Sequence, residues 1–261
     1  MKIIDSHCHA GLSWFEPVEM LITQMDLNNV DKGVLIQHRG VYDNAYLFDC
    51  ADRFPGRFYV VVLVEVKNNK ATNHLQKLAD AGAHGVRMQP ADRSDDPDPL
   101  AIWRKAQSLR LPVSTLGTLD QFASSWFEEM VKELNELTIV IEHMAGVGYE
   151  IEEPYSDFMR VLNLSKYPNV YLKVGGLGEF IQRPHTLSDR FMMDDPTPLL
   201  KLALDAFGHE RVMWGSDFPP VSNREGYHNA LNGIQFHKAL GTRVQKEWVM
   251  GKTAKHVFQR D

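Results

Sequence analysis

The sequence predicts a single (β/α)8 barrel, the TIM barrel of the α/β class, that spans residues 1–261 as one domain. Three observations support this fold. Eight short runs rich in β-branched residues alternate with amphipathic stretches along the chain. The length of 261 residues suits one such barrel, which typically needs about 250 residues. No glycine-rich phosphate loop follows the first run, which argues against a doubly wound nucleotide-binding sheet of similar size.

These patterns place the elements in order along the chain. Strands are predicted over residues 2–7, 32–38, 57–66, 84–89, 111–115, 137–143, 169–175 and 211–217. Helical spacing of apolar residues predicts helices over 16–29, 43–54, 73–82, 100–109, 119–136 and 156–167, and a last helix over 242–258 that completes the outer ring. The longest irregular stretch, residues 176–198, follows the seventh strand and is predicted to form a lid or a substrate wall.

Composition and charge exclude several classes of protein. Hydrophobic residues make up 44% of the chain and charged residues 24%, as in ordinary globular proteins. A net charge of −6 gives no basic surface for nucleic acid, and no apolar run approaches the roughly 18 residues that span a membrane. Cys8 and Cys50 make no disulfide framework, and no signal peptide is visible, so we expect a cytoplasmic protein.

Polar side chains gather where the predicted strands end, and in barrel enzymes the chemistry takes place at those carboxyl ends. Such groups are costly to bury unless they work together, so the strand ends predict an active site. The residues concerned are Asp5, His7 and His9 on the first strand, Gln37, His38 and Arg39 on the second, Arg87 and Gln89 on the fourth, Glu142 and His143 on the sixth, Lys173 on the seventh, and Ser216 and Asp217 on the eighth.

Alternation along a strand sharpens this prediction, because side chains two residues apart share a face. Asp5, His7 and His9 are therefore expected on one face, and the same parity is expected to bring His143 and Asp217 toward the barrel axis. Imidazole and carboxylate are ligands that zinc accepts, and they are also the groups that exchange protons near neutral pH. The residues alone leave a metal site and an acid–base site open.

Each of these residues also has a purely structural explanation. A His-x-His pair alone is a weak signal for a site, and His38 could bond only a loop carbonyl. Lys173 could extend its ammonium group to the rim of the barrel. Cys8 and Cys50 are expected as buried apolar side chains, because nothing in the sequence marks either thiol as activated. The conjunction of polar groups at six strand ends favours the active site.

Three motifs carry a resemblance to a known family. DSHCH after the first strand, IEHMAG on the sixth and WGSDFPP on the eighth resemble the amidohydrolase superfamily. Within it the chain is similar to the amidohydrolase-related branch, which includes 2-pyrone-4,6-dicarboxylate lactonase, sugar-acid lactonases and decarboxylases. The stretches DNAYLFDCADRFPGRFYVV, HGVRMQP, VYLKVGGLGEF and GKTAKHVF extend the resemblance over nearly the whole chain.

The resemblance implies roles for individual residues. His7 and His9 match the histidine pair of the first strand, and His143 matches the histidine of the sixth. Asp217 matches the aspartate that family members use as a general base and sometimes as a metal ligand. Arg87 matches a position that binds a substrate carboxylate or carbonyl. If a metal is bound, its implied ligands are His7, His9, His143 and Asp217.

Two departures from the family pattern bear on the metal. The fourth strand carries Arg87 and Gln89 where many metal-dependent members have a bridging lysine or glutamate. The fifth strand, residues 111–115, lacks the metal-binding histidine of the related decarboxylases. The sequence therefore leaves open whether the protein holds one divalent metal, with zinc expected first, or works without a metal, as some lactonases of this branch do.

The leading hypothesis is a hydrolase that opens a lactone, or a similar ester, of a carboxylated small molecule. Asp217 would take a proton from water, while His7, His9 and His143, or one divalent metal that they hold, would polarise the carbonyl. The residues expected to bind the substrate are Arg87, His38, Lys173, Gln89 and Tyr42.

Three alternatives stay open at this point. One is a metal-dependent decarboxylase of an aromatic or muconate-type acid, and another is a sugar-acid lactone isomerase. The third is a binding protein on an enzyme scaffold that has lost its activity. By analogy with barrels of this branch, a homo-oligomer is expected.

Overall fold

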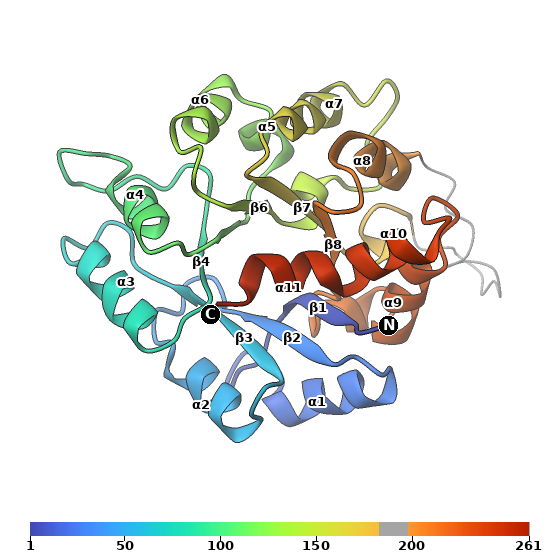
Figure 1. Cartoon of the computed structure of the whole chain (residues 1–261), viewed down its shortest axis with the longest axis horizontal. Coiled ribbons are helices and arrows are strands. Elements are labelled where there is room, and N and C mark those ends of the chain that lie inside the picture. Colours follow the sequence, from blue (N-terminus) through green and yellow to red (C-terminus); the bar gives the residue numbers. More distant parts are fainter. Residues whose placement is uncertain (183–197, 261) are drawn as a thin grey trace.

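Eight parallel strands form one ring in a computed structural model that describes residues 1–182 and 198–260. Each strand pairs with the next one in sequence, and the helices surround the ring (Figure 1). The (β/α)8 prediction is confirmed. The strands are β1 Ile4–Cys8, β2 Lys32–Ile36, β3 Phe58–Leu63, β4 Gly85–Met88, β5 Val113–Thr115, β6 Ile139–Ile141, β7 Val170–Val174 and β8 Val212–Trp214.

The ring closes between its first and last strands. The backbone N–H of Asp217 donates to the carbonyl of His7 at 2.8 Å, and the N–H of His9 donates to the carbonyl of Phe218 at 2.8 Å. A parallel bridge joins Cys8 to Phe218 between these two bonds. The closure therefore joins the DSHCH and WGSDFPP motifs, although they stand at opposite ends of the sequence.

The carboxylate of Asp5 reinforces this closure. It accepts hydrogen bonds from the backbone N–H of Ser216 at 2.8 Å, from the Ser216 hydroxyl at 2.6 Å and from the Tyr227 hydroxyl at 2.9 Å. Burial raises the pKa of Asp5 to about 6, even though these hydrogen bonds oppose the rise. Tyr227 belongs to the outer helix layer, so the Asp5 side chain points outward.

The expectation that Asp5 shares a face with His7 and His9 is therefore wrong. Asp5 pairs with Gly33 and Cys8 pairs with Leu35. Between these two pairs, β1 advances by three residues while β2 advances by two. This bulge inserts one extra residue and reverses the alternation of side chains along β1. Asp5 consequently faces the helices, while His7 and His9 face the site.

All the predicted helices are present, and two further helices, at Leu199–Phe207 and Tyr227–Gln235, lie outside the predicted ranges. Two of the predicted stretches differ in detail. The stretch predicted as one helix over 119–136 is two helices, because the side chains of Thr118 and Ser124 each cap a new start. The stretch 242–258 is helical throughout but contains a π-turn, η5 Trp248–Lys252. The helices are α1 Val18–Leu27, α2 Ala45–Arg53, α3 Ala71–Asp80, α4 Ala101–Ser108, α5 Leu119–Phe122, α6 Ser125–Glu133, α7 Ser156–Leu162, α8 Leu199–Phe207, α9 Tyr227–Gln235, α10 Arg243–Glu247 and α11 Thr253–Phe258, and the 3-10 turns are η1 His143–Gly146, η2 Asn163–Lys166, η3 Leu177–Glu179 and η4 Pro220–Asn223.

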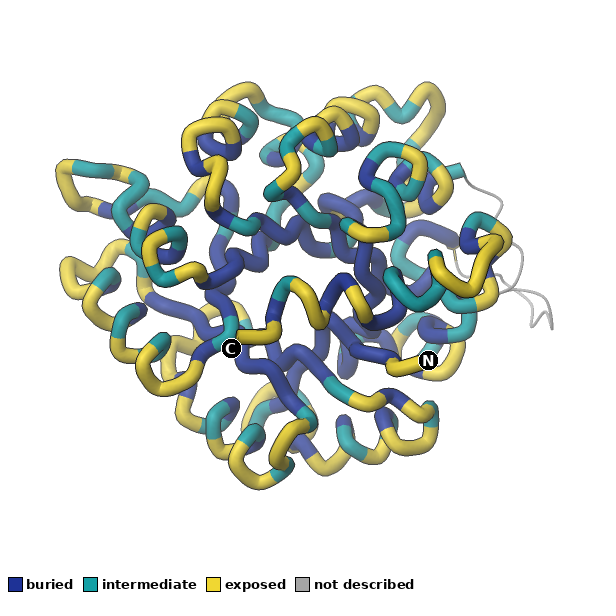
Figure 2. The backbone as a smooth tube through the Cα atoms, in the orientation of Figure 1, coloured by how far each residue is buried: buried dark blue, intermediate teal, exposed yellow. Residues whose placement is uncertain are grey.

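The apolar core has two layers. The larger one lies between the strands and the outer helices, whose outer faces are exposed (Figure 2). The smaller one fills the inside of the ring, and α11 contributes Ala254 and Phe258 to it. Helix α11 crosses the ring at the face where the strands begin (Figure 1). Side chains therefore fill the amino end of the barrel, and the polar strand ends lie at the other end.

Within residues 1–182 and 198–260, no helix combines the length and the apolar character that crossing a bilayer requires.

Gly251 in η5 offers a test of how the amino end of the barrel is packed. A Cβ atom at this position would overlap the carbonyl oxygen of Lys2. We expect Gly251→Ala to lower the free energy of unfolding by about 1–3 kcal/mol, because the backbone has to shift. Gly241→Ala is the control, since its nearest neighbour would be the Gln245 Oε1 atom at 3.9 Å. Urea denaturation measures both variants, and equal stability of the two would contradict the packing.

Candidate active site

His7 and His9 form the centre of the site at the end of β1. Their Nε2 atoms lie 3.1 Å apart, and both side chains are buried. His9 Nδ1 lies 2.7 Å from the carbonyl of Ile36, so Nδ1 carries the hydrogen and Nε2 of a neutral His9 keeps its lone pair. His7 Nδ1 lies 3.3 Å from the Lys173 Nζ atom, which only donates when charged. Hydrogen bonds therefore run in one direction, from Lys173 through His7 and His9 to Ile36.

Asp217 follows β8 and faces the two histidines. Its Oδ1 atom lies 3.7 Å from His9 Nε2 and 3.9 Å from His7 Nε2, and its Oδ2 atom accepts a 2.9 Å bond from Arg224. Burial alone raises the pKa of Asp217, but the neighbouring histidines and Arg224 outweigh burial and lower the pKa to about 2. Asp217 is therefore a carboxylate at neutral pH, with one oxygen directed at the histidine pair.

His143 is the charged histidine of the site. Its Nδ1 atom lies 3.0 Å from Glu179 Oε1, and its ring packs edge-on against His7 with centroids 4.7 Å apart. Burial lowers the pKa of His143, but Glu179, Asp217 and Glu142 outweigh burial and raise the pKa to about 9. His143 is therefore an imidazolium at neutral pH, whereas burial and the nearby Lys173 charge hold the pKa of His7 well below its usual value.

The route that brings His143 into the site differs from the predicted one. Val140 lies in the inner core and Ile141 in the outer core, so alternation turns Glu142 inward rather than His143. Strand β6 ends at Ile141, and the next turn carries left-handed φ angles of 52°, 47° and 64° at residues 143–145. The parity argument for His143 was wrong. This strained turn, of a kind that clusters at functional sites, presents the side chain instead.

Glu142 occupies the buried position next to the histidines. It accepts bonds from Arg87 Nη2 at 2.8 Å and from the Ser114 hydroxyl at 2.7 Å, and Ser114 in turn accepts a 2.8 Å bond from Lys173. Burial raises the pKa of Glu142, but Arg87, Lys173 and His143 outweigh burial and lower the pKa to about 2. Arg87 also donates to the Gln37 carbonyl at 3.2 Å. The structure thus places Arg87 in a buried ion pair rather than as a free receptor for a substrate carboxylate.

The remaining predicted residues take separate positions. His38 packs against Phe15 with ring centroids 4.8 Å apart, and Phe15 stacks on His9 at 5.0 Å, so His38 belongs to an aromatic wall beside the histidine pair. Gln89 uses its backbone N–H to bond Asp92, and Tyr42 is an exposed side chain between β2 and α2. Among the described residues, no hydrogen bond or ring contact joins Gln89 or Tyr42 to the histidines or to Asp217.

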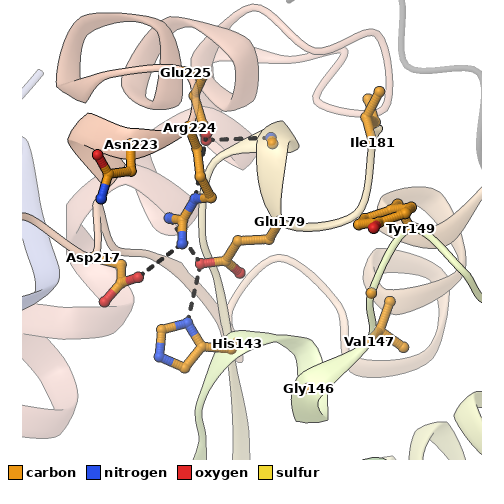
Figure 3. Close-up of a pocket in the computed structure, with 12 residues that line it drawn as sticks. His143, Gly146, Val147, Tyr149, Glu179, Ile181, Asp217, Asn223, Arg224 and Glu225 are labelled. Carbon is orange, nitrogen blue, oxygen red and sulfur yellow. Dashed lines mark hydrogen bonds and ion pairs between the residues drawn. The ribbon is translucent and has the colours of Figure 1, made fainter. Parts of the chain in front are cut away.

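A pocket of about 580 Å³ opens beside His143 and Asp217 (Figure 3). Sequence reasoning missed the charged residues of its wall, because they stand on loops and not on strands. Glu179 belongs to η3, and Arg224 and Glu225 follow η4. Arg224 bridges Asp217 and Glu179, with 3.4 Å between its Nη2 atom and Glu179 Oε1. Of the predicted wall over 176–198, residues 183–197 lie outside the described part of the chain.

The glycines of the VGGLGEF stretch explain how this wall is built. A Cβ atom at Gly176 or Gly178 would overlap the carboxylate of Glu225, and the Gly178 N–H donates to that carboxylate at 3.2 Å. The close approach of backbone to carboxylate therefore requires glycine here. A short glycine-rich run ending in an acidic residue directly after a barrel strand is the sequence signal that could have pointed to Glu179.

Comparison with known proteins assigns the family. A family model described as amidohydrolase matches residues 4–260. The chain belongs to the amidohydrolase family. The resemblance noted from the DSHCH, IEHMAG and WGSDFPP motifs is confirmed. The three motifs meet in this amidohydrolase, because His7 packs against His143 and lies 3.9 Å from Asp217.

Relatives of this amidohydrolase include a lactonase and several solved barrels. An L-fucono-1,5-lactonase of Burkholderia ambifaria is 27% identical over 197 residues, which cover 71% of this chain and 63%, less than two thirds, of the lactonase. A zinc-bound amidohydrolase structure from Burkholderia multivorans has a TM-score of 0.80 at 18% identity, and a probable 2-pyrone-4,6-dicarboxylic acid hydrolase from Acinetobacter baumannii with bound citric acid has 0.76 at 20%. Both matches cover 99% of each chain and show the shared fold.

The site residues fit a divalent metal. His7, His9 and Asp217 bring two imidazole nitrogens and one carboxylate oxygen within 4.8 Å of one another, a donor set that zinc accepts. To bind a metal, His7 would have to free its Nε2 atom and carry its hydrogen on Nδ1, where Lys173 now donates. Glu142 Oε1 lies 3.7 Å from Nδ1 and could then accept that hydrogen. Lys173 therefore opposes metal binding by its hydrogen bond and by its charge.

Lys173→Met tests this opposition. The variant keeps the length of the buried side chain but removes the donor to His7 and one positive charge, so we expect zinc to bind at least tenfold more tightly. Competition with a chromophoric chelator measures the affinity. Lys67→Met, at an exposed position, should leave the zinc affinity unchanged. Equal zinc affinity of the wild type and Lys173→Met would show that Lys173 does not set the state of His7.

Arg87→Met tests the buried ion pair. Removing the arginine leaves the Glu142 carboxylate without its main partner, so we expect the free energy of unfolding to fall by about 3–5 kcal/mol at pH 7. Because the pKa of Glu142 is lowered to about 2, the ion pair stabilises the fold above about pH 4.5 and loses its effect as the pH falls toward 2. The difference between wild type and variant should shrink over that range in urea titrations. Arg104→Met, in an exposed ion pair, should cost far less.

Proposed function

We propose that this chain is a hydrolase that opens the ring of a lactone. One observation carries the proposal: an ionised Asp217 and an imidazolium at His143 face the same pocket. This arrangement offers a carboxylate to activate water and an N–H donor to receive charge on a carbonyl oxygen. The lactonase relative, 27% identical over 71% of this chain, supports the same reaction.

The reaction follows from the positions of these groups. Asp217 accepts a proton from water through its Oδ1 atom, and the oxygen of that water attacks the lactone carbonyl. The Nε2–H of the charged His143 stabilises the oxyanion, while Glu179 holds the other nitrogen of His143. The ring C–O bond then breaks, and the leaving oxygen takes the proton that Asp217 holds. Lactones are activated acyl donors, so no serine or cysteine nucleophile is required.

A divalent metal fits this scheme but is not required by it. Zinc, the metal that the donor set favours, would be held by His7, His9 and Asp217, with His143 as a further candidate, and would supply Lewis-acid polarisation of the carbonyl when bound. The other roles belong to the chain's own residues. Phe15 packs against His9 and His38 packs against Phe15, so both rings cover one side of the histidine pair, and Arg224 orients the Asp217 carboxylate.

The pocket favours a hydroxylated lactone of the sugar-acid type. Arg87 is paired with Glu142, and Arg224 is paired with Asp217 and Glu179, so protein carboxylates already engage both arginines. The wall also presents Glu225 and Asn223, and groups of these types accept hydrogen bonds from sugar hydroxyls. A carboxylated lactone is the second candidate, because Arg224 retains N–H donors at the pocket wall.

Two alternative reactions are distinguishable from hydrolysis. The decarboxylase has less support, because Ser114 on β5 belongs to the Glu142 network and that strand offers no histidine. A lactone isomerase would use the same groups but would leave the product a lactone. We also propose a cytoplasmic location, in keeping with two buried free cysteines. Assembly into a homo-oligomer stays a prediction.

Asp217→Asn tests the proposal on a panel of sugar-acid lactones and carboxylated lactones. We expect kcat to fall about 10²–10⁴-fold because the water loses its base, while circular dichroism stays unchanged. Asp205→Asn, which removes an exposed carboxylate on α8, is the matched control and should keep the parent rate. NMR of the products separates a hydroxy acid from an isomerised lactone, and parallel assays with a chelator measure the contribution of a metal.

The outcomes divide clearly. Hydrolysis at the parent rate by Asp217→Asn would refute the assigned base. Absence of turnover by the wild type on every lactone, with and without added zinc, would refute the lactonase proposal.

A further inference from the structure

A second pocket lies at the amino end of the barrel, on the opposite side of the inner core from the active site. Its volume is about 840 Å³, within the range of sites for small organic ligands. The C-terminal helices and the starts of the first three strands enclose it. Its lining residues are Met1, Lys2, Ile4, Asp31, Lys32, Tyr59, Glu247, Gly251, Lys252, Lys255, Gln259 and Arg260.

Positive charge is concentrated in this amino-end pocket. Five of its twelve lining residues are lysine or arginine and two are acidic, whereas the whole chain has 28 basic residues in 261 and a net charge of −6. A concave surface of one sign focuses its field and attracts ligands of the opposite sign. An acidic protein thus presents a basic pocket at one end.

The acidic residues of the pocket already have partners. Asp31 accepts a 2.8 Å bond from the backbone N–H of Ile3, and Glu247 is paired with Lys252 at 2.7 Å and with Arg243 at 2.8 Å. Three lysines, in contrast, have no carboxylate within ion-pair distance among the described residues. These are Lys2, Lys32 and Lys255, and their charge is available to a ligand.

Tyr59 contributes an accessible hydroxyl to the pocket. The residue is 94% buried, since its exposed fraction is 6%, and it lines the pocket, yet its hydroxyl has no hydrogen-bond partner within residues 1–182 and 198–260. Lys32 Nζ lies 5.0 Å from the centre of the Tyr59 ring, and His84 packs edge-on against the ring at 5.0 Å. Burial, with the charges of Arg260 and Lys32, lowers the pKa of His84 to about 4, in keeping with the positive field.

We propose that the amino-end pocket binds an organic phosphate, with its phosphoryl oxygens on Lys32 and Lys255 and a hydrogen bond from Tyr59. The choice of phosphate over carboxylate rests on the kind of cation. Arg260 donates hydrogen bonds to the carbonyls of Ala83 at 2.7 Å and Leu109 at 3.3 Å. The cations that remain available to a ligand are therefore lysines. Lysine ammonium groups act as point charges toward phosphate, whereas planar carboxylates suit the arginine fork. The volume leaves room for an organic group beside the phosphate.

Calorimetric titration with adenosine diphosphate, pyrophosphate and citrate tests the proposal on the intact protein. We expect adenosine diphosphate to bind most tightly and citrate most weakly. Lys32→Gln/Lys255→Gln should weaken nucleotide binding at least tenfold, and Tyr59→Phe should weaken it several-fold. Lys67→Gln/Lys238→Gln removes the same charge from exposed positions elsewhere and should leave the affinity unchanged. Thermal unfolding checks that each variant folds.

Three results would overturn the proposal. One is equal loss of affinity in both double variants, which would mean that only net charge matters. Another is tighter binding of citrate or pyrophosphate than of adenosine diphosphate, which would remove the organic phosphate as the ligand class. The third is the absence of saturable binding to the wild type. None of these results bears on lactone hydrolysis, because the pocket shares no residue with the active site.

Discussion

Closure of the ring between β1 and β8 is the constraint on which the site depends. Residues 211 positions apart in sequence meet there, where the Asp5 carboxylate accepts two bonds from Ser216 and one from Tyr227. Backbone bonds beside them tie Asp217 to His7. Asp5, two positions before His7, thus holds the last strand against the first, and the positions of His7, His9 and Asp217 follow from this closure.

The charges around the site give its histidines different protonation states. His143 lies among the carboxylates of Glu179, Asp217 and Glu142, which raise its pKa to about 9 in spite of burial. His7 also lies within 4 Å of Glu142 and Asp217, but burial and the positive charges of Lys173 and His143 lower its pKa. The site therefore has a cationic donor and a neutral hydrogen-bonding pair within one cluster. A hydrolase that must both accept and donate protons can use this division.

Periodicity predicted the eight strands and the end of the barrel that carries the polar residues. It also placed Asp217 correctly relative to the core, since Met213 lies in the inner cluster two steps before Gly215. Alternation failed at Asp5 and His143, because a bulge and a left-handed turn change the direction of a side chain without changing the hydrophobic pattern. Glu179 and Arg224 were missed because their positions depend on loop paths, which no period describes. Family resemblance supplied roles that spacing alone could not.

The packing of Ala254 and Phe258 inside the ring has a kinetic consequence. Ala254 and Phe258 fill the amino end of the barrel, so a reactant enters the site from the pocket beside His143 and Asp217. In a lactonase built this way, the hydroxy acid must depart along the path on which the next lactone arrives. Substrate and product then use the same pocket opening and contact many of the same residues. Accumulated product is therefore expected to act as a competitive inhibitor of the substrate.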